Sequence, residues 1–213
     1  LRFIQAMICQ QQSVMKRGTI HLCKIGILLL DRDFEHDIYE LIKAFYPEGD
    51  IHSLYEKDEE EYDIFFTVKK ENDNFVIKYE TKDQKGVASA EVIRGADGDS
   101  SQETHEKLRD AHELRKANKD SLKYALYNVL VKLTGRTLPW GNLTGIRPAK
   151  LAMGMIESGM KNTEIAQEMR ERYLVSAKKT ALAITIANRE RALLQDIDYE
   201  QREDEMFVNT KLV

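Results

Sequence analysis

The sequence of 213 residues has few features of secreted or membrane proteins. It contains two cysteines, Cys9 and Cys23, fourteen positions apart, which form neither a metal-binding pattern nor a disulfide framework. Its longest apolar run, residues 25–30, is far shorter than the roughly 18 residues that a membrane span requires. No small-residue cleavage site follows the short apolar segment after Lys16 and Arg17. These absences predict a cytoplasmic protein with reduced thiols and no membrane partner.

The sequence also lacks the short motifs of several enzyme classes. It contains no G-x-x-x-x-G-K-[ST] phosphate loop, no G-x-G-x-x-G dinucleotide motif and no G-x-S-x-G nucleophile elbow. Carboxylates are plentiful, but many fall in charged runs such as residues 56–63, which are typical of solvated loops. We therefore expect no self-contained catalysis, with neither a catalytic residue nor a metal site in this chain.

Charge is abundant and unevenly distributed. The composition is 42% hydrophobic and 32% charged, which is typical of a globular protein, and the net charge is −4. Residues 136–191 nevertheless carry ten Lys and Arg against five Asp and Glu. This basic half could face an acidic ligand, nucleic acid or an acidic partner domain, or it could be ordinary helix-surface charge.

Hydrophobic spacing predicts an α+β fold that begins with a small β-α-β-β-β layer. Residues 25–30 are expected to form a buried strand, and Asp31 or Asp33 to cap the helix that follows. Alternating residues predict strands near 62–68 and 75–79, paired as a hairpin, and another at 87–93. We expect a single helix to cover this sheet. Its apolar face would comprise Phe34, Ile38, Leu41, Ile42 and Phe45.

The second half is expected to be a mostly helical segment, with one long helix followed by three shorter ones. The long helix runs for about thirty residues from Glu103 and stops at Gly135, with a possible break near Asn118. The shorter helices are expected at 148–157, at 164–172 with a cap at 162 or 163, and from a cap at 176 to about 195. We expect Leu182, Ile186 and Leu193 on the inner face of the last helix.

These patterns suggest four segments. Residues 1–24 are expected to form a poorly ordered upstream extension, and residues 25–100 a small α+β domain. Residues 101–195 would form the helical domain. Residues 196–213 read as a linker and the truncated start of a further domain.

The stretch from Thr137 to Lys150 contains the only Trp and two of the three prolines. Pro148 suits the first position of a helix, and Thr144 or Gly145 could cap that helix or make the turn before it. Arg147 and Lys150 would then lie beside free N–H groups, which together make a possible anion site. Alternatively, Trp140 is a core anchor and the glycines are turn residues. The candidate anion or docking motif comprises Trp140, Gly141, Thr144, Gly145, Arg147, Pro148 and Lys150.

This stretch resembles a known family. The segment Leu138-Pro-Trp-Gly-Asn-Leu-Thr-Gly-Ile-Arg-Pro-Ala-Lys150 is similar to the LPWG-x-LTGIRP-x-K signature of oxygen-independent coproporphyrinogen dehydrogenases of the clostridial and bacillar type, which are radical S-adenosylmethionine (SAM) proteins. The resemblance covers roughly residues 25–195, and in the family the signature lies ahead of the catalytic barrel. It includes Asp33-Phe34, Ala44-Phe-Tyr-Pro47, Tyr173-Leu-Val-Ser176 and Ala187-Asn-Arg-Glu-Arg191.

The resemblance implies a parent enzyme of haem biosynthesis that oxidatively decarboxylates two propionates of coproporphyrinogen III, using a [4Fe–4S] cluster and S-adenosylmethionine. The C-x3-C-x2-C cluster motif is absent from these residues. We therefore expect the chain to bind neither cofactor and to be inactive alone. The implied partners are the radical SAM domain in cis and an anionic tetrapyrrole, whose four carboxylates could meet Arg147 and Lys150.

Two other functions stay open. The chain could be a stand-alone protein-binding module with the accessory fold. It could also be a helix-turn-helix DNA-binding protein, since Thr163–Ala166 and Leu174–Ser176 resemble parts of that motif and Lys178 and Lys179 follow. The spacing disfavours nucleic acid, because Ala166 and Ser176 are ten positions apart and the motif has a turn of about three or four residues.

Overall fold

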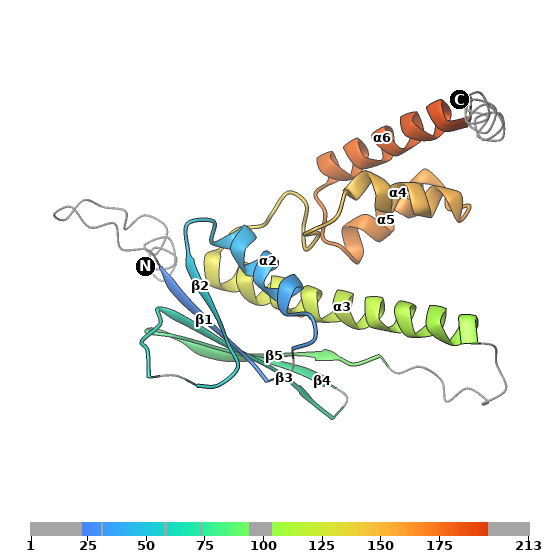
Figure 1. Cartoon of the computed structure of the whole chain (residues 1–213). Coiled ribbons are helices and arrows are strands. Elements are labelled where there is room, and N and C mark those ends of the chain that lie inside the picture. Colours follow the sequence, from blue (N-terminus) through green and yellow to red (C-terminus); the bar gives the residue numbers. More distant parts are fainter. Residues whose placement is uncertain (1–22, 31, 58, 73, 94–103, 196–213) are drawn as a thin grey trace, which may run out of the picture.

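The computed structural model describes residues 23–30, 32–57, 59–72, 74–93 and 104–195. It has a five-stranded sheet with one helix inserted, then one long and three shorter helices (Figure 1). The α+β fold predicted from the sequence is confirmed. The predicted upstream extension, apart from residues 23 and 24, and the predicted linker at 196–213 lie outside the described residues.

The sheet has the spatial order β2-β1-β3-β4-β5. Strand β1 (Lys24–Leu29) is parallel to both β2 (Asp50–Leu54) and β3 (Ile64–Glu71). The predicted hairpin is confirmed, since β3 pairs antiparallel with β4 (Asn74–Thr81), and β4 pairs with β5 (Lys85–Glu91) in the same way. Sequence patterning missed β2, because His52 and Ser53 interrupt its short apolar pattern. β2 completes a β-α-β unit in which α2 connects two parallel strands.

Helix α2 (Glu35–Phe45) buries the side chains that its periodicity predicts: Ile38, Leu41, Ile42 and Phe45. Its start differs from the prediction. The residue before the helix is Phe34, in a left-handed conformation with φ 66°, and no side chain caps the helix. Asp33 instead forms an ion pair with Arg115 at 3.5 Å. Because the chain turns at Phe34, the expected cap at Asp33 is wrong, and Asp31 lies outside the described residues.

Helix α3 (Thr104–Thr134) is continuous through Asn118, so the break predicted there is wrong. The Asn118 amide faces the end of the sheet, where Oδ1 accepts the Ile93 N–H at 2.7 Å and Nδ2 donates to the Ile93 carbonyl at 2.9 Å. The polar residue that weakened the apolar stripe therefore joins α3 to the segment after β5. Gly135 ends the helix as predicted, with φ 70° and its N–H bonded to the Val131 carbonyl.

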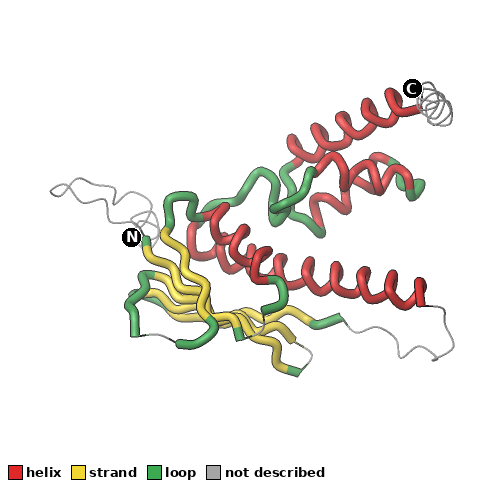
Figure 2. The backbone as a smooth tube through the Cα atoms, in the orientation of Figure 1, coloured by secondary structure: helices red, strands yellow, loops and turns green. Residues whose placement is uncertain are grey.

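Two helices cover the same face of the sheet (Figure 2). The expectation of a single covering helix is wrong, because the second half of α3 packs beside α2 and against β5. Although its N-terminal half has few apolar residues, α3 thus contributes to the core formed with the sheet, called here the sheet core. The residues that α3 buries there are Leu122, Ala125, Leu126, Tyr127, Val129, Leu130 and Leu133. The domain limits drawn at residues 100 and 101 stay a prediction.

The opposite face of the sheet carries aromatic side chains over β1. A β-carbon on Gly26 would lie 2.7 Å from a ring carbon of Phe65 and 2.9 Å from Cγ of Tyr62. Glycine at this position therefore makes room for two rings, whose centroids are 5.5 Å apart. Further along this face, Val87 is 66% exposed, so the covering is confined to one part of the sheet.

Helices α4 (Pro148–Glu157), α5 (Asn162–Glu171) and α6 (Ala177–Gln195) enclose a second core, called here the helical core. It consists of Ala152, Ile156, Ile165, Met169, Tyr173, Val175, Ala183 and Ala187. The predicted cap of α5 at residue 162 or 163 is wrong. The capping residue is Lys161, whose N–H donates to the Glu164 carboxylate at 2.8 Å.

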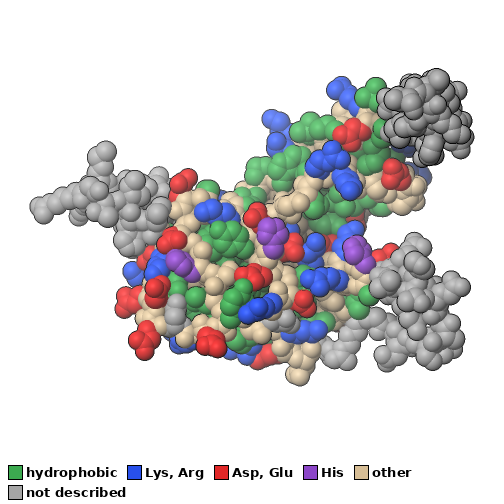
Figure 3. Space-filling view, in the orientation of Figure 1, with side chains coloured by type: hydrophobic (Ala, Val, Ile, Leu, Met, Phe, Trp, Pro, Cys, Tyr) green, Lys and Arg blue, Asp and Glu red, His purple; other side chains and the backbone are tan. Residues whose placement is uncertain are grey.

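Helix α6 has the opposite orientation to the one predicted. Leu182, Ile186 and Leu193 are 43%, 37% and 69% exposed, whereas Ala183 and Ala187 are buried. Small side chains let α6 approach α4 and α5 closely, so the large aliphatic ones point outwards. Hydrophobic side chains are prominent over the part formed by α4–α6, while charged ones are interspersed over the sheet and α3 (Figure 3). None of the described helices is both long and apolar enough to span a bilayer.

Candidate functional site: the signature loop and the cavities beside it

The loop from Thr137 to Arg147, called here the signature loop, connects α3 to α4. Gly141 and Gly145 have φ of 59° and 73°, which glycine adopts readily, and both serve turns. Pro148 occupies the first helical position of α4, as predicted, and Arg147 is the residue before it. Thr144 does not cap α4, because Arg147 is the residue before the helix and no side chain caps it. The Thr144 Oγ1 instead accepts a hydrogen bond from Lys123 Nζ at 2.8 Å. The loop residue Thr144 thus reaches α3 instead of its own helix.

The first half of the signature loop is fixed to the connection between α5 and α6. The Asn142 N–H donates to the Tyr173 carbonyl at 3.0 Å, and the Ser176 N–H donates to the Pro139 carbonyl at 3.1 Å. Asn142 is 2% exposed, and its Nδ2 lies 3.5 Å from the Arg172 carbonyl. Two stretches about thirty residues apart therefore form one backbone-bonded layer. The candidate motif did not include Asn142, although it makes the central contacts.

Trp140 is half-buried against the helical core, and Lys179 Nζ lies 5.1 Å from the centre of its ring. This geometry agrees with the core-anchor interpretation of Trp140 and adds a cation–π contact. Lys179, one of two lysines considered for DNA contact, is thereby engaged within the molecule.

Arg147 and Lys150 are exposed at the start of α4. Neither lines the two cavities described below. Their assignment as contacts for an anion therefore stays a prediction, and the structure brings a different set of cations together.

A basic pocket of about 290 Å³ lies between α3 and the signature loop. Its cations come from one face of α3: Arg115, Lys116, Lys119 and Lys123. Asn142, Leu143 and Thr144 form the opposite wall. Sequence reasoning missed this site, because it sought cations within the motif. The sequence does contain a pattern that indicates the site. Basic residues recur every four positions at 115, 119 and 123, and therefore share one face of the helix.

Lys123 is the buried member of this set, with 6% of its surface exposed. Its Nζ lies 3.8 Å from Oδ1 of Asp37 on α2, and Lys119 Nζ lies 3.7 Å from the same oxygen. Burial lowers the pKa of the Lys123 ammonium, and the nearby Asp37 carboxylate opposes that shift. One carboxylate is thus shared between two cations at distances beyond a hydrogen bond.

Asp120 joins α3 to the end of α5. Its Oδ2 accepts hydrogen bonds from Arg172 Nη2 at 3.0 Å and from the Tyr173 hydroxyl at 3.2 Å. Burial, with the nearby Asp120 carboxylate, raises the pKa of the Tyr173 hydroxyl to about 12. This cluster holds the helical core against α3 in a defined position.

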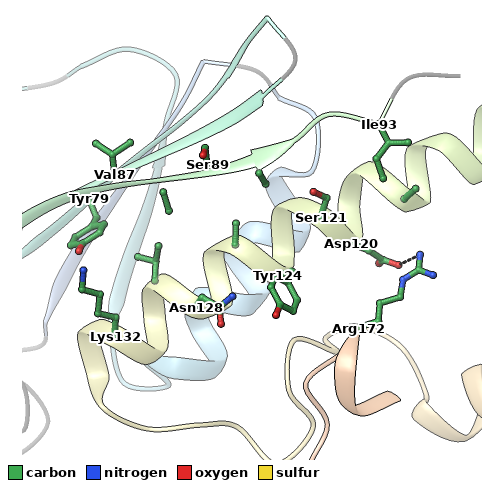
Figure 4. Close-up of a pocket in the computed structure, with 15 residues that line it drawn as sticks. Tyr79, Val87, Ser89, Ile93, Asp120, Ser121, Tyr124, Asn128, Lys132 and Arg172 are labelled. Atoms are coloured by element: carbon green, nitrogen blue, oxygen red, sulfur yellow. Dashed lines mark hydrogen bonds and ion pairs between the residues drawn. The ribbon is translucent and has the colours of Figure 1, made fainter. Parts of the chain in front are cut away.

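A larger groove of about 710 Å³ lies between α3 and β5, the edge strand of the described sheet (Figure 4). Small side chains leave this space open: Ala88, Ala90, Ala117 and Ala125. In Figure 4, Lys132 and Tyr79 lie at one end, while Arg172 bonds Asp120 at the other. The groove therefore has a basic side chain at each end, with small apolar and uncharged polar side chains between them.

The [4Fe–4S] cluster implied by the resemblance does not fit the cysteines present. A [4Fe–4S] cluster is held by cysteine thiolates, and the sequence has only Cys9 and Cys23, without the C-x3-C-x2-C spacing. Within the described ranges, no three or more His, Cys, Asp or Glu side chains are grouped to hold a metal ion.

Comparison with curated proteins shows similarity to a protein of Bacillus subtilis. The oxygen-independent coproporphyrinogen-III oxidase-like protein HemZ of Bacillus subtilis (strain 168) is 37% identical over 79 residues, which are 37% of this chain and 16% of HemZ. No family model matches the chain, and no solved structure matches it. The match to HemZ supports the predicted family relation over a partial region of the chain.

Proposed function

We propose that this chain is the amino-terminal accessory part of an oxygen-independent coproporphyrinogen III dehydrogenase-like radical SAM protein of haem biosynthesis. The observation that carries this proposal is the 37% identity with HemZ over 79 residues. The match covers 16% of HemZ, so most of that protein lies outside it. The chain's role would be docking and support on the substrate side, and the chemistry would belong to the catalytic region in cis.

The docking surface that we propose is the outer face of α6. Leu182, Ile186 and Leu193 recur there at helical spacing, and all three are exposed. Several exposed apolar side chains on one helix face mark an interaction site more often than an isolated exposed leucine does. Its occupant would be the catalytic region, because the chain resembles the part of the family that precedes the barrel.

A chimera of HemZ tests this function. Residues 25–195 would replace the corresponding region of HemZ, and anaerobic conversion of coproporphyrinogen III would be measured with the cluster reconstituted. We expect the chimera to be active and the double variant Leu182→Asp, Ile186→Asp to lose at least tenfold in rate. Thr163→Asp, at an exposed position of α5, is the matched control and should retain activity.

Circular dichroism of the isolated chain would verify that each variant keeps its helices. An inactive chimera that is folded and holds its cluster would contradict the accessory role. Full activity in the double variant would retain the role and remove α6 as the docking surface.

The groove beside β5 favours a second candidate, a protein-binding module. An extended peptide could add to the edge of β5 and place small apolar side chains over the alanines. Lys132 at one end of the groove would favour a peptide with an acidic residue there. Selection from a peptide library should then enrich acidic sequences, and Lys132→Glu should abolish that enrichment. Selection without any enriched sequence would remove this candidate.

A further inference from the structure

The basic pocket holds more cationic than anionic side chains. Four cations of α3 line it, and the carboxylates that line it are Asp37 and Asp120. Asp120 is already bonded by Arg172 and Tyr173, and Arg172 lies outside the pocket lining. Asp37 is therefore the lining carboxylate shared by Lys119 and Lys123, while Arg115 is paired with Asp33, which lies outside the pocket lining.

The ammonium of Lys123 is the strongest indication of a ligand. It is more than nine-tenths buried, and such a group is costly to bury unless paired. Its three N–H bonds meet one acceptor within hydrogen-bond distance among the described residues, Thr144 Oγ1 at 2.8 Å. An anion in the pocket would satisfy its remaining donors. Burial lowers the pKa of the Lys123 ammonium, and the carboxylates of Asp37, Asp120 and Glu40 oppose that shift.

The surroundings favour a compact anion. Lys116 and Lys119 follow Lys123 outwards along the same face of α3, so a negatively charged group would meet several ammonium groups. The opposite wall supplies the Thr144 hydroxyl, and Leu143, Ile146 and Leu151 add apolar surface. The volume of about 290 Å³ suits one charged group with a short apolar stem rather than a whole macrocycle.

We propose that the basic pocket binds an oxyanion, the carboxylate or phosphate group of a ligand, with Lys123 at its base and Lys119 and Lys116 beside it. The site stands on this geometry alone. Its assignment to a propionate of a tetrapyrrole rests on the proposed function. Carboxylate and phosphate ligands share this chemistry. Titration with coproporphyrin III and with inorganic phosphate distinguishes between them.

Isothermal titration calorimetry of the full chain with coproporphyrin III and, separately, with inorganic phosphate tests the proposal. We expect Lys123→Met, which keeps the apolar stem and removes the charge, to weaken binding at least tenfold for whichever of the two probes binds. Lys119→Met should also weaken it, and this half-buried position puts the fold at less risk. Lys57→Met is the matched control, because Lys57 is exposed and outside the pocket, and it should change affinity less than twofold.

Each result decides the proposal. Coproporphyrin binding that depends on Lys123 and Lys119 supports a carboxylate ligand, and phosphate binding with the same dependence supports a phosphate ligand. Binding that neither variant changes, or no binding of either probe at millimolar concentration, overturns the site. If Lys123→Met fails to fold, Lys119→Met alone decides. Because the HemZ chimera measures docking and conversion, its failure is distinguishable from failure of this site.

Discussion

The Tyr173 carbonyl oxygen lies 1.9 Å from the position that a β-carbon on Gly141 would occupy. The signature loop and the α5–α6 connection are therefore in backbone contact, and any other side chain at position 141 would force them apart. The adjacent hydrogen bond from the Asn142 N–H to the same carbonyl holds the two stretches at this distance.

Replacing Gly141 with alanine should destabilise the protein by about 3 kcal/mol or more. A left-handed non-glycine residue costs about 1–2 kcal/mol, and forcing atoms into a packed site costs about 1–3 kcal/mol. Gly145→Ala is the control, because Gly145 has φ 73° in the same loop and open space around it. It should cost about 1 kcal/mol. Urea unfolding followed by circular dichroism measures both, and equal losses would show that the close contact is unimportant.

Asn118→Ala should lower the free energy of unfolding by about 1–2 kcal/mol, since both backbone groups of Ile93 lose a hydrogen-bond partner. Amide hydrogen exchange at Ile93 should also accelerate. Glu113→Ala, at an exposed position of α3, should leave both quantities unchanged. Unchanged exchange at Ile93 in the Asn118 variant would mean that this bond does not hold α3 to the sheet.

The orientation of α6 predicts that substitutions on its buried face cost more stability than substitutions on its exposed face. Ala187→Leu should destabilise by about 1–3 kcal/mol, because Ala187 is fully buried in the helical core. Leu182→Ala should change stability by about 0.5 kcal/mol or less, since Leu182 is exposed. Thermal unfolding of the two variants makes the comparison. The reverse ranking would restore the orientation that we predicted from the sequence.

Stability should fall as pH rises from about 10 to about 12. The Tyr173 hydroxyl keeps its proton to about pH 12 in the folded state, whereas an unfolded tyrosine loses it near pH 10. Over this interval the unfolded state binds fewer protons, so alkali favours unfolding. The difference in urea midpoint between the wild type and Tyr173→Phe, measured across this range, isolates the contribution. A difference that does not vary with pH would contradict the raised pKa.

Local patterns predicted the elements whose partners are close in sequence. The buried face of α2, the β3–β4 hairpin, the end of α3 at Gly135 and the start of α4 at Pro148 all agree with their sequence signals. Each depends on backbone preferences or on spacing within one element. The sequence therefore sufficed for the fold class and most of the helices.

Features set by tertiary contacts were not predictable in this way. Asn118 indicated a break because it is a polar residue on an apolar stripe. Its partner, Ile93, lies twenty-five positions away, so local sequence does not show the hydrogen bonds that the Asn118 amide makes. The predicted inner face of α6 was wrong because the helix packs through alanines, whose small side chains allow it to approach α4 and α5 closely. The candidate motif included Thr144 but not its partner Lys123, since a lysine on a helix is usually a surface residue.

Trp140 also provides a fluorescence probe that is confined to one of the two cores. It is the only tryptophan, and it packs against the helical core under the ammonium of Lys179. Its emission therefore reports on the environment of the helical core, while far-ultraviolet circular dichroism reports on all the helices and strands. If the two signals change together during unfolding, the two cores behave as one cooperative unit. If the emission changes first, the signature loop separates from its neighbours while the sheet is still intact.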